Sequence, residues 1–323
     1  MRPTLRTWIK HILLLLITLV TATIAGVLYP FGGINAMPAD PQSWGELVDL
    51  LSTLPLTYSI LIGNTIQTLL TDPALLKDGL SFSLSLIFIL LSHEMGHYVA
   101  CRIYGVDATL PFFIPTPPMI GPAGTLGAVI KIKSPMPSRK AVFDIGVAGP
   151  IAGFVALVPI AIIGIATMQP VPSQAVPAPG SLTFTDPLFS RLIGAVVGID
   201  PAYAIGNPFY FAAWVGLLVT ALNLIPAGQL DGGHAIYAIF GKQVHRLTGM
   251  IAFLMMTALA IVGFVYFNSP SGFLVAVLLG VMTRIRHPDP YDQSPLDPTR
   301  KAVAFLTLLI FLLSFVPFAI RIN

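Results

Sequence analysis

Charged residues are scarce in this chain of 323 residues: Asp, Glu, Lys and Arg together account for 10% of it, against 55% for hydrophobic residues. With a mean hydropathy of +0.84, this composition excludes a soluble enzyme and indicates a polytopic membrane protein. The net charge of +3 is spread over the loops without a dense patch, so we expect no nucleic-acid partner. A single cysteine, Cys101, excludes a disulfide framework and a cysteine-rich metal site.

Glutamate occurs only twice and histidine six times, yet His93, Glu94 and His97 fall within five residues. The surrounding run from Leu80 to Ala100 carries no other charge and is long enough to cross a bilayer. Ionisable groups at membrane depth are costly and normally mark a functional site. On a helix the two histidines share a face and can bind one cation, and Glu94 can then exchange protons with a metal-bound water. The alternative is a pair of core histidines beside a satisfied carboxylate.

Seven apolar runs predict transmembrane helices, in a fold of the all-α polytopic class. They lie at 9–30, 80–102, 141–167, 206–226, 246–267, 271–284 and 302–320. A further run at 50–70 is broken by Pro55, Asn64 and Gln67, and we expect it to lie on the membrane surface or to re-enter the membrane. The chain then divides into an N-terminal part at 1–79, a core at 80–240 and a C-terminal group of helices at 241–323.

The basic residues predict the orientation in the membrane. With a cytoplasmic N-terminus and seven crossings, 14 of the 17 basic residues are cytoplasmic, and only Lys77, Arg191 and Arg321 are outside. A crossing by 50–70 would reverse this bias unless the N-terminus also lay outside, so we predict that this run does not cross. The basic start and the apolar run after it could form a signal peptide, but no clear small-residue cleavage site follows, so we expect a retained first span.

Two connecting regions differ in character. Residues 107–140 are rich in proline and glycine yet mostly apolar, and 124–133 ends in strand-like alternation. We expect a re-entrant β-hairpin beside the metal-binding helix, because irregular backbone at membrane depth needs protein or water around it. An ordinary cytoplasmic loop is the alternative. Residues 169–207 form a proline-rich loop that is too short for a typical inserted domain.

A catalytic zinc site usually has three protein ligands and one open position, so a third ligand is needed here. His93, Glu94 and His97 form an HExxH motif, which in some zinc proteases extends to HExxHxxGxxH with a third histidine ligand. Here Ala100 and Ile103 stand at the glycine and last histidine positions, so this third ligand is absent. A downstream glutamate is excluded as well, since the only other glutamate, Glu46, lies upstream.

Asp231, His234 and Asp144 are the remaining candidates at predicted membrane depth, and we favour Asp231. Pro226 and the neighbouring glycines break the helix at the end of the fourth predicted span, so Asp231 can turn toward a cation; a helix N-cap is the alternative. We expect His234 to support the site or to be structural, and Asp144 to start a helix or to take part in catalysis. Cys101 is expected to be a buried thiol, with ligation as the alternative.

These motifs together resemble the site-2 protease family of intramembrane zinc metalloproteases. The resemblance rests on His-Glu-Met-Gly-His at 93–97, Gly-Thr-Leu-Gly-Ala at 124–128, Gly-Pro-Ile-Ala-Gly at 149–153, and Asn223, Pro226 and Leu230-Asp231-Gly232. It implies that His93, His97 and Asp231 bind one zinc ion and that Glu94 is the general base. It also implies that Asn223 assists substrate or oxyanion binding and that 109–133 guides the substrate.

The resemblance further implies an activity and a location. The expected substrates are single-span membrane proteins, cleaved within the lipid bilayer. The layout has no inserted PDZ-like domain and is similar to compact bacterial and plastid-type members, which predicts a bacterial inner membrane and an active site toward the cytoplasm. An edge strand near 129–133 is predicted to hold an unwound substrate by β-addition. The rival interpretation is a zinc or proton-coupled transporter, which would spread polar groups through both leaflets rather than toward one face.

Overall fold

A computed structural model describes residues 4–34, 43–119, 122–171, 180–285 and 287–323, so residues 172–179 of the predicted loop at 169–207 lie outside the described residues. Within these ranges the chain is mostly helical, as predicted. The helices are α1 (Leu5–Val27), α2 (Trp44–Thr71), α3 (Pro73–Ile103), α4 (Arg139–Ala166), α5 (Leu188–Val197), α6 (Pro208–Leu224), α7 (Asp231–Phe240), α8 (Lys242–Phe267), α9 (Ser271–Met282) and α10 (Pro298–Ser314). The strands are β1 (Phe112–Pro115), β2 (Thr125–Val129), β3 (Gln169–Pro170), β4 (Leu182–Phe184), β5 (Ala204–Ile205) and β6 (Ile320–Ile322).

Each of the seven predicted spans contains a helix, but not all of these helices are long. In the described part of the chain, five helices are long and apolar enough to cross a membrane: α1, α2, α3, α4 and α8. The fourth, sixth and seventh predicted spans correspond to the shorter helices α6, α9 and α10. The last prediction was too long, because α10 ends at Ser314, just before Pro317, and the chain from Ile320 pairs with β4 instead. Seven crossings therefore remain a prediction.

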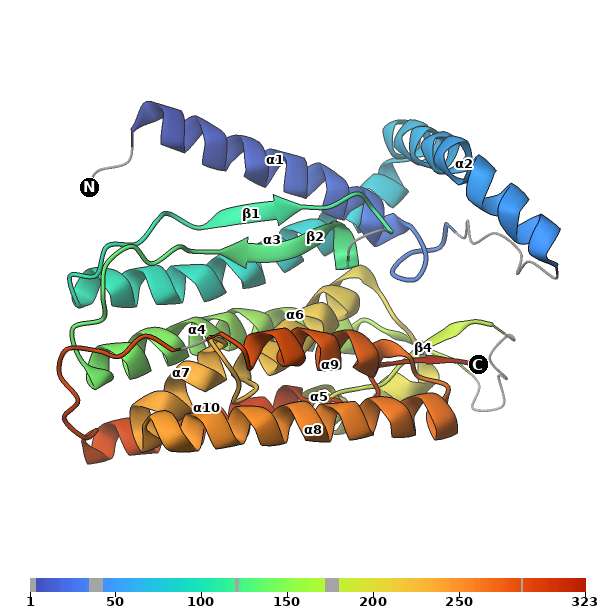
Figure 1. The fold of residues 1–323 in the computed structure, drawn as a ribbon. Helices are drawn as coiled ribbons and strands as arrows, with labels where there is room; N and C mark the ends of the chain where they lie inside the picture. Colours follow the sequence, from blue (N-terminus) through green and yellow to red (C-terminus); the bar gives the residue numbers. More distant parts are fainter. Residues whose placement is uncertain (1–3, 35–42, 120–121, 172–179, 286) are drawn as a thin grey trace.

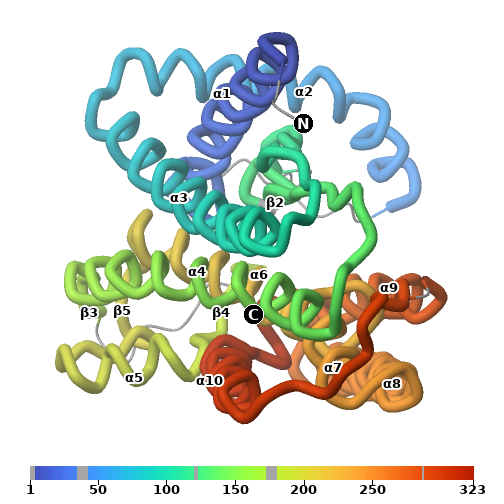
Figure 2. The backbone as a smooth tube through the Cα atoms, turned by 90° about the vertical axis from the view of Figure 1, so that its left-hand side faces the viewer, coloured from blue at the N-terminus to red at the C-terminus, as the bar shows by residue number. Residues whose placement is uncertain are grey.

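α2 is a continuous helix of 28 residues, in the segment where we expected breaks at Pro55, Asn64 and Gln67. Its hydroxyl groups are satisfied inside the helix: Thr65 donates to the carbonyl oxygen of Leu61 at 2.8 Å. Length and hydropathy alone would therefore allow α2 to cross. Figures 1 and 2 show that it runs across the direction of the other long helices rather than alongside them. Its position on the membrane surface stays a prediction.

The centre of the molecule is formed by α3 packed on α4, with α6 against both. Glycines lie where α3 and α4 cross: a Cβ atom on Gly96 would lie 2.4 Å from the carbonyl oxygen of Ala148, and one on Gly149 would lie 2.1 Å from Nε2 of His97. No larger residue fits such a crossing, because a buried backbone cannot yield by an ångström without loss of packing. The two glycines thus bring the histidine-bearing helix against its neighbour.

The predicted hairpin is present as an antiparallel pair of strands, with Phe112 opposite Val129 and Phe113 opposite Ala128. It lies between α1 and α3 in both views (Figures 1 and 2). Its second strand begins earlier than we expected: β2 ends at Val129, and 130–133 continues only with looser pairing to 107–109. The hairpin thus lies against the histidine-bearing helix α3, while its entry into the membrane stays a prediction.

Two further two-stranded sheets were not predicted. β3 pairs with β5, and β4 pairs with β6. The second sheet joins the segment after α4 to the end of the chain, which closes the face of the molecule opposite to the histidine motif. Short pairings of this kind have no strong sequence signal, because each strand has only two or three residues.

Candidate metal centre

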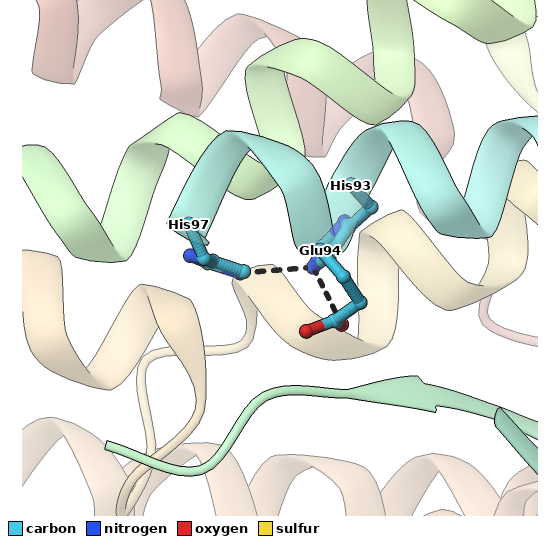
Figure 3. A group of neighbouring side chains, drawn as sticks. All are labelled: His93, Glu94 and His97. Atoms are coloured by element: carbon cyan, nitrogen blue, oxygen red, sulfur yellow. Dashed lines mark hydrogen bonds and ion pairs between the residues drawn. The ribbon is translucent and has the colours of Figure 1, made fainter. Parts of the chain in front are cut away.

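His93 and His97 lie one turn apart on the same face of α3, with Glu94 beside them (Figure 3). All three side chains belong to buried residues, with exposed fractions of 4%, 7% and 8% for His93, His97 and Glu94. Buried imidazole and carboxylate groups need partners, because an unpaired polar group away from water is unfavourable by several kcal/mol. The partners come from four other parts of the chain: α4, α6, α7 and the segment just after β2.

Asp231 is the first residue of α7, which follows the turn after α6. A Cβ atom on Gly232 would lie 2.0 Å from the carbonyl oxygen of Leu224, so only glycine allows α7 to start this close to the end of α6. The alternative role of Asp231 as an N-cap is wrong: Leu230 occupies the cap position, and no side chain caps this helix. The carboxylate points to the histidine pair instead.

Three acceptor atoms meet at this point. Oδ2 of Asp231 lies 3.3 Å from Nε2 of His93 and 3.4 Å from Nε2 of His97, and the two Nε2 atoms are 3.1 Å apart. Nδ1 of His97 donates to the carbonyl oxygen of Ile145 at 2.6 Å, so a neutral His97 presents a lone pair at Nε2. In the described part of the chain, no lysine or arginine forms an ion pair with Asp231.

This donor set fits zinc. With zinc–ligand distances of about 2.0–2.1 Å, two ligands of a tetrahedral site lie about 3.3 Å apart, close to all three observed separations. Two imidazoles and one carboxylate form a known catalytic zinc set that keeps the fourth position open. The bond from His97 to Ile145 is also the outer contact that orients a metal-binding histidine.

Glu94 lies beside this triangle rather than in it. Its Oε1 atom is 3.9 Å from Nε2 of His93, and its carboxylate interacts with the backbone of Ile130, just after β2. In Figure 3 the green strand of the hairpin passes below the Glu94 side chain. Glu94 therefore stands between the three acceptor atoms and the hairpin.

Asn223, from the end of α6, reaches the same place. Its Nδ2 atom lies 3.3 Å from Nε2 of His93. The side chain is thus directed to the site rather than to the carbonyl groups of its own helix. A cation at Nε2 of His93 would remove this acceptor and leave the amide N–H available to another oxygen atom.

The other sequence candidates lie elsewhere. Asp144 accepts hydrogen bonds from Tyr104 and from Arg300, whose Nε lies 2.9 Å from Oδ1, so it joins α3, α4 and α10. It neither starts a helix, since α4 begins at Arg139, nor faces the histidines. Cys101 is fully buried in an apolar cluster and, among the described residues, is not grouped with the candidate ligands.

His234 makes a contact that sequence reasoning missed. Its Nδ1 atom lies 2.6 Å from Nε2 of His287, and the His287 ring stacks on Tyr237 with centroids 3.9 Å apart. Nδ1 of His287 donates to the carbonyl oxygen of Pro288, so His234 must be the donor in the pair. Burial and the neighbouring His234 lower the pKa of His287 to about 3, so this ring is neutral near pH 7. The histidine in His-Pro-Asp-Pro at 287–290 was the available signal.

A cavity of about 780 Å³ opens onto the three acceptor atoms. One wall carries His93, Glu94, His97 and Asp231, and the opposite wall is the hairpin backbone from 126 to 132. A backbone wall of this kind offers hydrogen-bonding groups along its length to an extended peptide.

Comparisons with known proteins agree with this geometry. The family model described as "Peptidase family M50" matches residues 81–263. The chain is 29% identical to the probable chloroplastic zinc metalloprotease EGY1 of Arabidopsis thaliana, over 74% of this chain and 43% of that protein. It is 34% identical to EGY2 of the same plant, also described as a probable chloroplastic zinc metalloprotease, over 57% and 33%. The chain thus spans less than half the length of these relatives.

Proposed function

The chain belongs to peptidase family M50, the site-2 protease family, and on this premise we propose that it hydrolyses peptide bonds of single-span membrane proteins inside the lipid bilayer. The proposal includes one zinc ion per chain, held by His93, His97 and Asp231, with Glu94 as general base. The observation that carries it is the triangle of Nε2, Nε2 and Oδ2 atoms with sides of 3.1–3.4 Å, in which both imidazoles come from α3, a helix long and apolar enough to cross a membrane, and the carboxylate comes from α7.

A zinc ion in this site supplies a Lewis acid that lowers the pKa of a bound water to about 7 and polarises a carbonyl group. Glu94 accepts the proton of the attacking water and returns it to the leaving amine, because its carboxylate borders the open side of the triangle. The amide N–H of Asn223 donates to the oxygen atom on which negative charge develops. The loss of such a donor typically slows hydrolysis about 10²–10³-fold.

A helical substrate must unwind before its carbonyl groups can be reached, because helical hydrogen bonds occupy them. We propose that the open side of β2 and the residues just after it pair with the unwound segment as an added strand. Support comes from the position of this backbone in the wall of the cavity, within reach of Glu94 at Ile130. The substrate would then lie between the hairpin and α3.

The proposed location is a bacterial cell membrane, with the N-terminus and the active site toward the cytoplasm. Support comes from the bias of basic residues, of which Arg139, Lys140, Lys242 and Arg300 lie near the end of the molecule that holds the metal centre. The named relatives are chloroplastic proteins, so a photosynthetic membrane is the alternative for this location.

The proposed function predicts that Glu94→Gln separates metal binding from hydrolysis. We expect the purified variant to keep one zinc per chain, because Glu94 is not a proposed ligand. Cleavage of a single-span substrate in liposomes should fall at least about 10²-fold, since a general base alone contributes about 10²–10⁴-fold. Metal analysis and gel-based cleavage assays measure the two properties.

The same experiment separates the protease from a carrier. If wild-type protein moved zinc across the liposome membrane, and neither form cut a substrate, the protease assignment would be wrong. Loss of zinc in Glu94→Gln would assign Glu94 to the ligand set and overturn its role as base.

A further inference from the structure

A second polar cavity, of about 530 Å³, lies away from the hairpin, at the start of α8 and the end of α9. Among the described residues, its charged lining consists of Lys242, Arg246 and Arg284, with no aspartate or glutamate. Three cationic side chains around one hollow repel one another, so the arrangement favours an anion between them.

The charges in this cavity are poorly compensated. Lys242 forms one exposed ion pair, with Nζ 3.3 Å from Oδ2 of Asp289. Arg246 and Arg284 make no side-chain hydrogen bond or ion pair with any residue that the structure describes. The first turn of α8, which begins at Lys242, has no side-chain cap either, so its N–H groups add to the positive potential. An anion with several oxygen atoms, such as a phosphate group, matches these donors.

Exposed apolar side chains lie one helical turn from two of the basic lining residues. Met250 follows Arg246 by four residues on α8 and is 52% exposed, and Val281 precedes Arg284 by three residues at the end of α9 and is 53% exposed. α8 is long and apolar enough to cross a membrane, so these side chains are placed to face acyl chains. A ligand that fills the cavity and covers these side chains needs a phosphate group and hydrocarbon chains together.

We propose that the hollow between Lys242, Arg246 and Arg284 binds the phosphate of an anionic phospholipid, with its acyl chains along α8 and α9. Basic pockets between membrane helices on the cytoplasmic side are a known setting for anionic headgroups. The basic residues predict this end of the molecule to be cytoplasmic.

The lipid site shares a wall with the metal centre. His245 lines the cavity, and its Nε2 atom lies 2.9 Å from the carbonyl oxygen of Gly228, three residues before Asp231. His287 also lines it and contacts His234 on α7. A headgroup that draws the start of α8 and the end of α9 together therefore supports the turn that carries Asp231. This consequence rests on the proposed function, whereas lipid binding itself does not.

Native mass spectrometry and thermal unfolding of the full chain test the proposal. Purified protein is titrated with phosphatidylglycerol and with phosphatidylcholine of the same acyl chains. We expect the wild type to bind phosphatidylglycerol and to unfold at a higher temperature with it. For Arg246→Gln with Arg284→Gln, we expect affinity about 30-fold lower, because each basic side chain strengthens binding of an anionic headgroup about fivefold.

Matched variants keep the test decisive. Arg102→Gln with Lys301→Gln removes the same charge at the same end of the molecule but outside the cavity, and should bind as the wild type does. Arg246→Lys with Arg284→Lys keeps the charge and should restore most of the binding to a folded protein. Zinc content of every variant reports on the metal centre separately, and a failed protease assay would leave the lipid result unchanged.

Three outcomes would overturn the proposal. Equal weakening by both pairs of glutamine substitutions would mean general attraction of lipid to a basic surface. Equal stabilisation by inorganic phosphate alone, in detergent without added lipid, would assign the cavity to a soluble phosphate compound. Binding of phosphatidylcholine as tight as that of phosphatidylglycerol would exclude an anionic headgroup as the ligand.

Discussion

Two polar clusters join distant parts of this chain, and they differ in what balances the carboxylate. Asp144 is paired with the guanidinium of Arg300 at 2.5 Å and with the hydroxyl of Tyr104. Asp231 faces two imidazole nitrogens and, among the described residues, has no lysine or arginine as a partner. The charge of Asp144 is balanced by a side chain of the protein, so Asp144 can link helices without any ligand. Asp231 lies at metal–ligand distances from two imidazole nitrogens, so this arrangement favours the binding of a metal cation.

The largest expected difference is in the zinc affinity of two variants, each with one of the two aspartates replaced. Asp231→Asn should lower zinc affinity by more than the roughly 100-fold that loss of an outer contact causes, because a proposed ligand is removed. Cleavage should become undetectable for the same reason. Asp144→Asn should keep zinc and lose stability only. The two variants can be compared by zinc titration with a competing chelator and by thermal unfolding. A similar loss of zinc in both variants would contradict the proposed difference between Asp231 and Asp144.

Gly149→Ala should disturb the metal cluster through packing alone. A Cβ atom at Gly149 would lie 2.1 Å from Nε2 of His97, whereas one at Gly153 would lie 3.1 Å from Cβ of His93. Overpacking of this kind destabilises by about 1–3 kcal/mol, and displacement of the His97 ring should lower zinc affinity about 10–100-fold. Gly153→Ala is the matched control on the same helix and should have a clearly smaller effect. Equal zinc affinity in the two variants would contradict this prediction.

Arg300→Gln should affect the structural cluster and leave the metal cluster intact. The change removes the cation from Asp144 and also the ion pair with Asp297. Since the Arg300 side chain is partly exposed, at 23%, we expect a loss of about 1–2 kcal/mol in the free energy of unfolding, below the range for fully buried pairs. Zinc content should remain one per chain. Tyr104→Phe removes a single hydrogen bond and should have about half this effect on denaturant unfolding.

The smallest expected effect is on the pH dependence of stability, and it comes from the contact between His234 and His287. The folded-state pKa of His287, about 3, is below the usual value for histidine. Its contribution to stability is therefore fully present above about pH 6.5 and is lost as the pH falls toward 3, by at most about 1.4 kcal/mol per pH unit. The unfolding temperature of the wild type should fall between pH 7 and pH 5. It should fall less in His287→Asn, and parallel curves would contradict the assignment.

The candidate metal site could be found in the sequence because its chemistry is rare there. His93 and His97 share one helix face with Glu94 beside them, and an aspartate at predicted membrane depth after a helix-breaking proline leaves few alternatives for a third ligand. Asn223 could be placed only by resemblance, since an asparagine in a helix equally often bonds to its own backbone.

The remaining features depend on tertiary contacts that no local pattern encodes. The pairing of Asp144 with Arg300 joins residues far apart in sequence, and each residue alone has several plausible roles. The stacking of His287 on Tyr237 depends on how the segment after α9 returns over α7. The breaks that we expected at Pro55, Asn64 and Gln67 are absent from α2, which bonds its own polar side chains: the hydroxyl of Ser59 donates to the carbonyl oxygen of Pro55, and that of Thr65 to the carbonyl oxygen of Leu61.

The order of the ligands along the chain has a consequence for biosynthesis. A ribosome delivers His93 and His97 long before Asp231, and α4 and α6 must insert before α7 can take its place beside them. Under the proposed function, a nascent chain therefore has only two of the three proposed zinc ligands until α7 is made. Hydrolytic activity is then expected to arise only after α3, α4 and α6 have packed together.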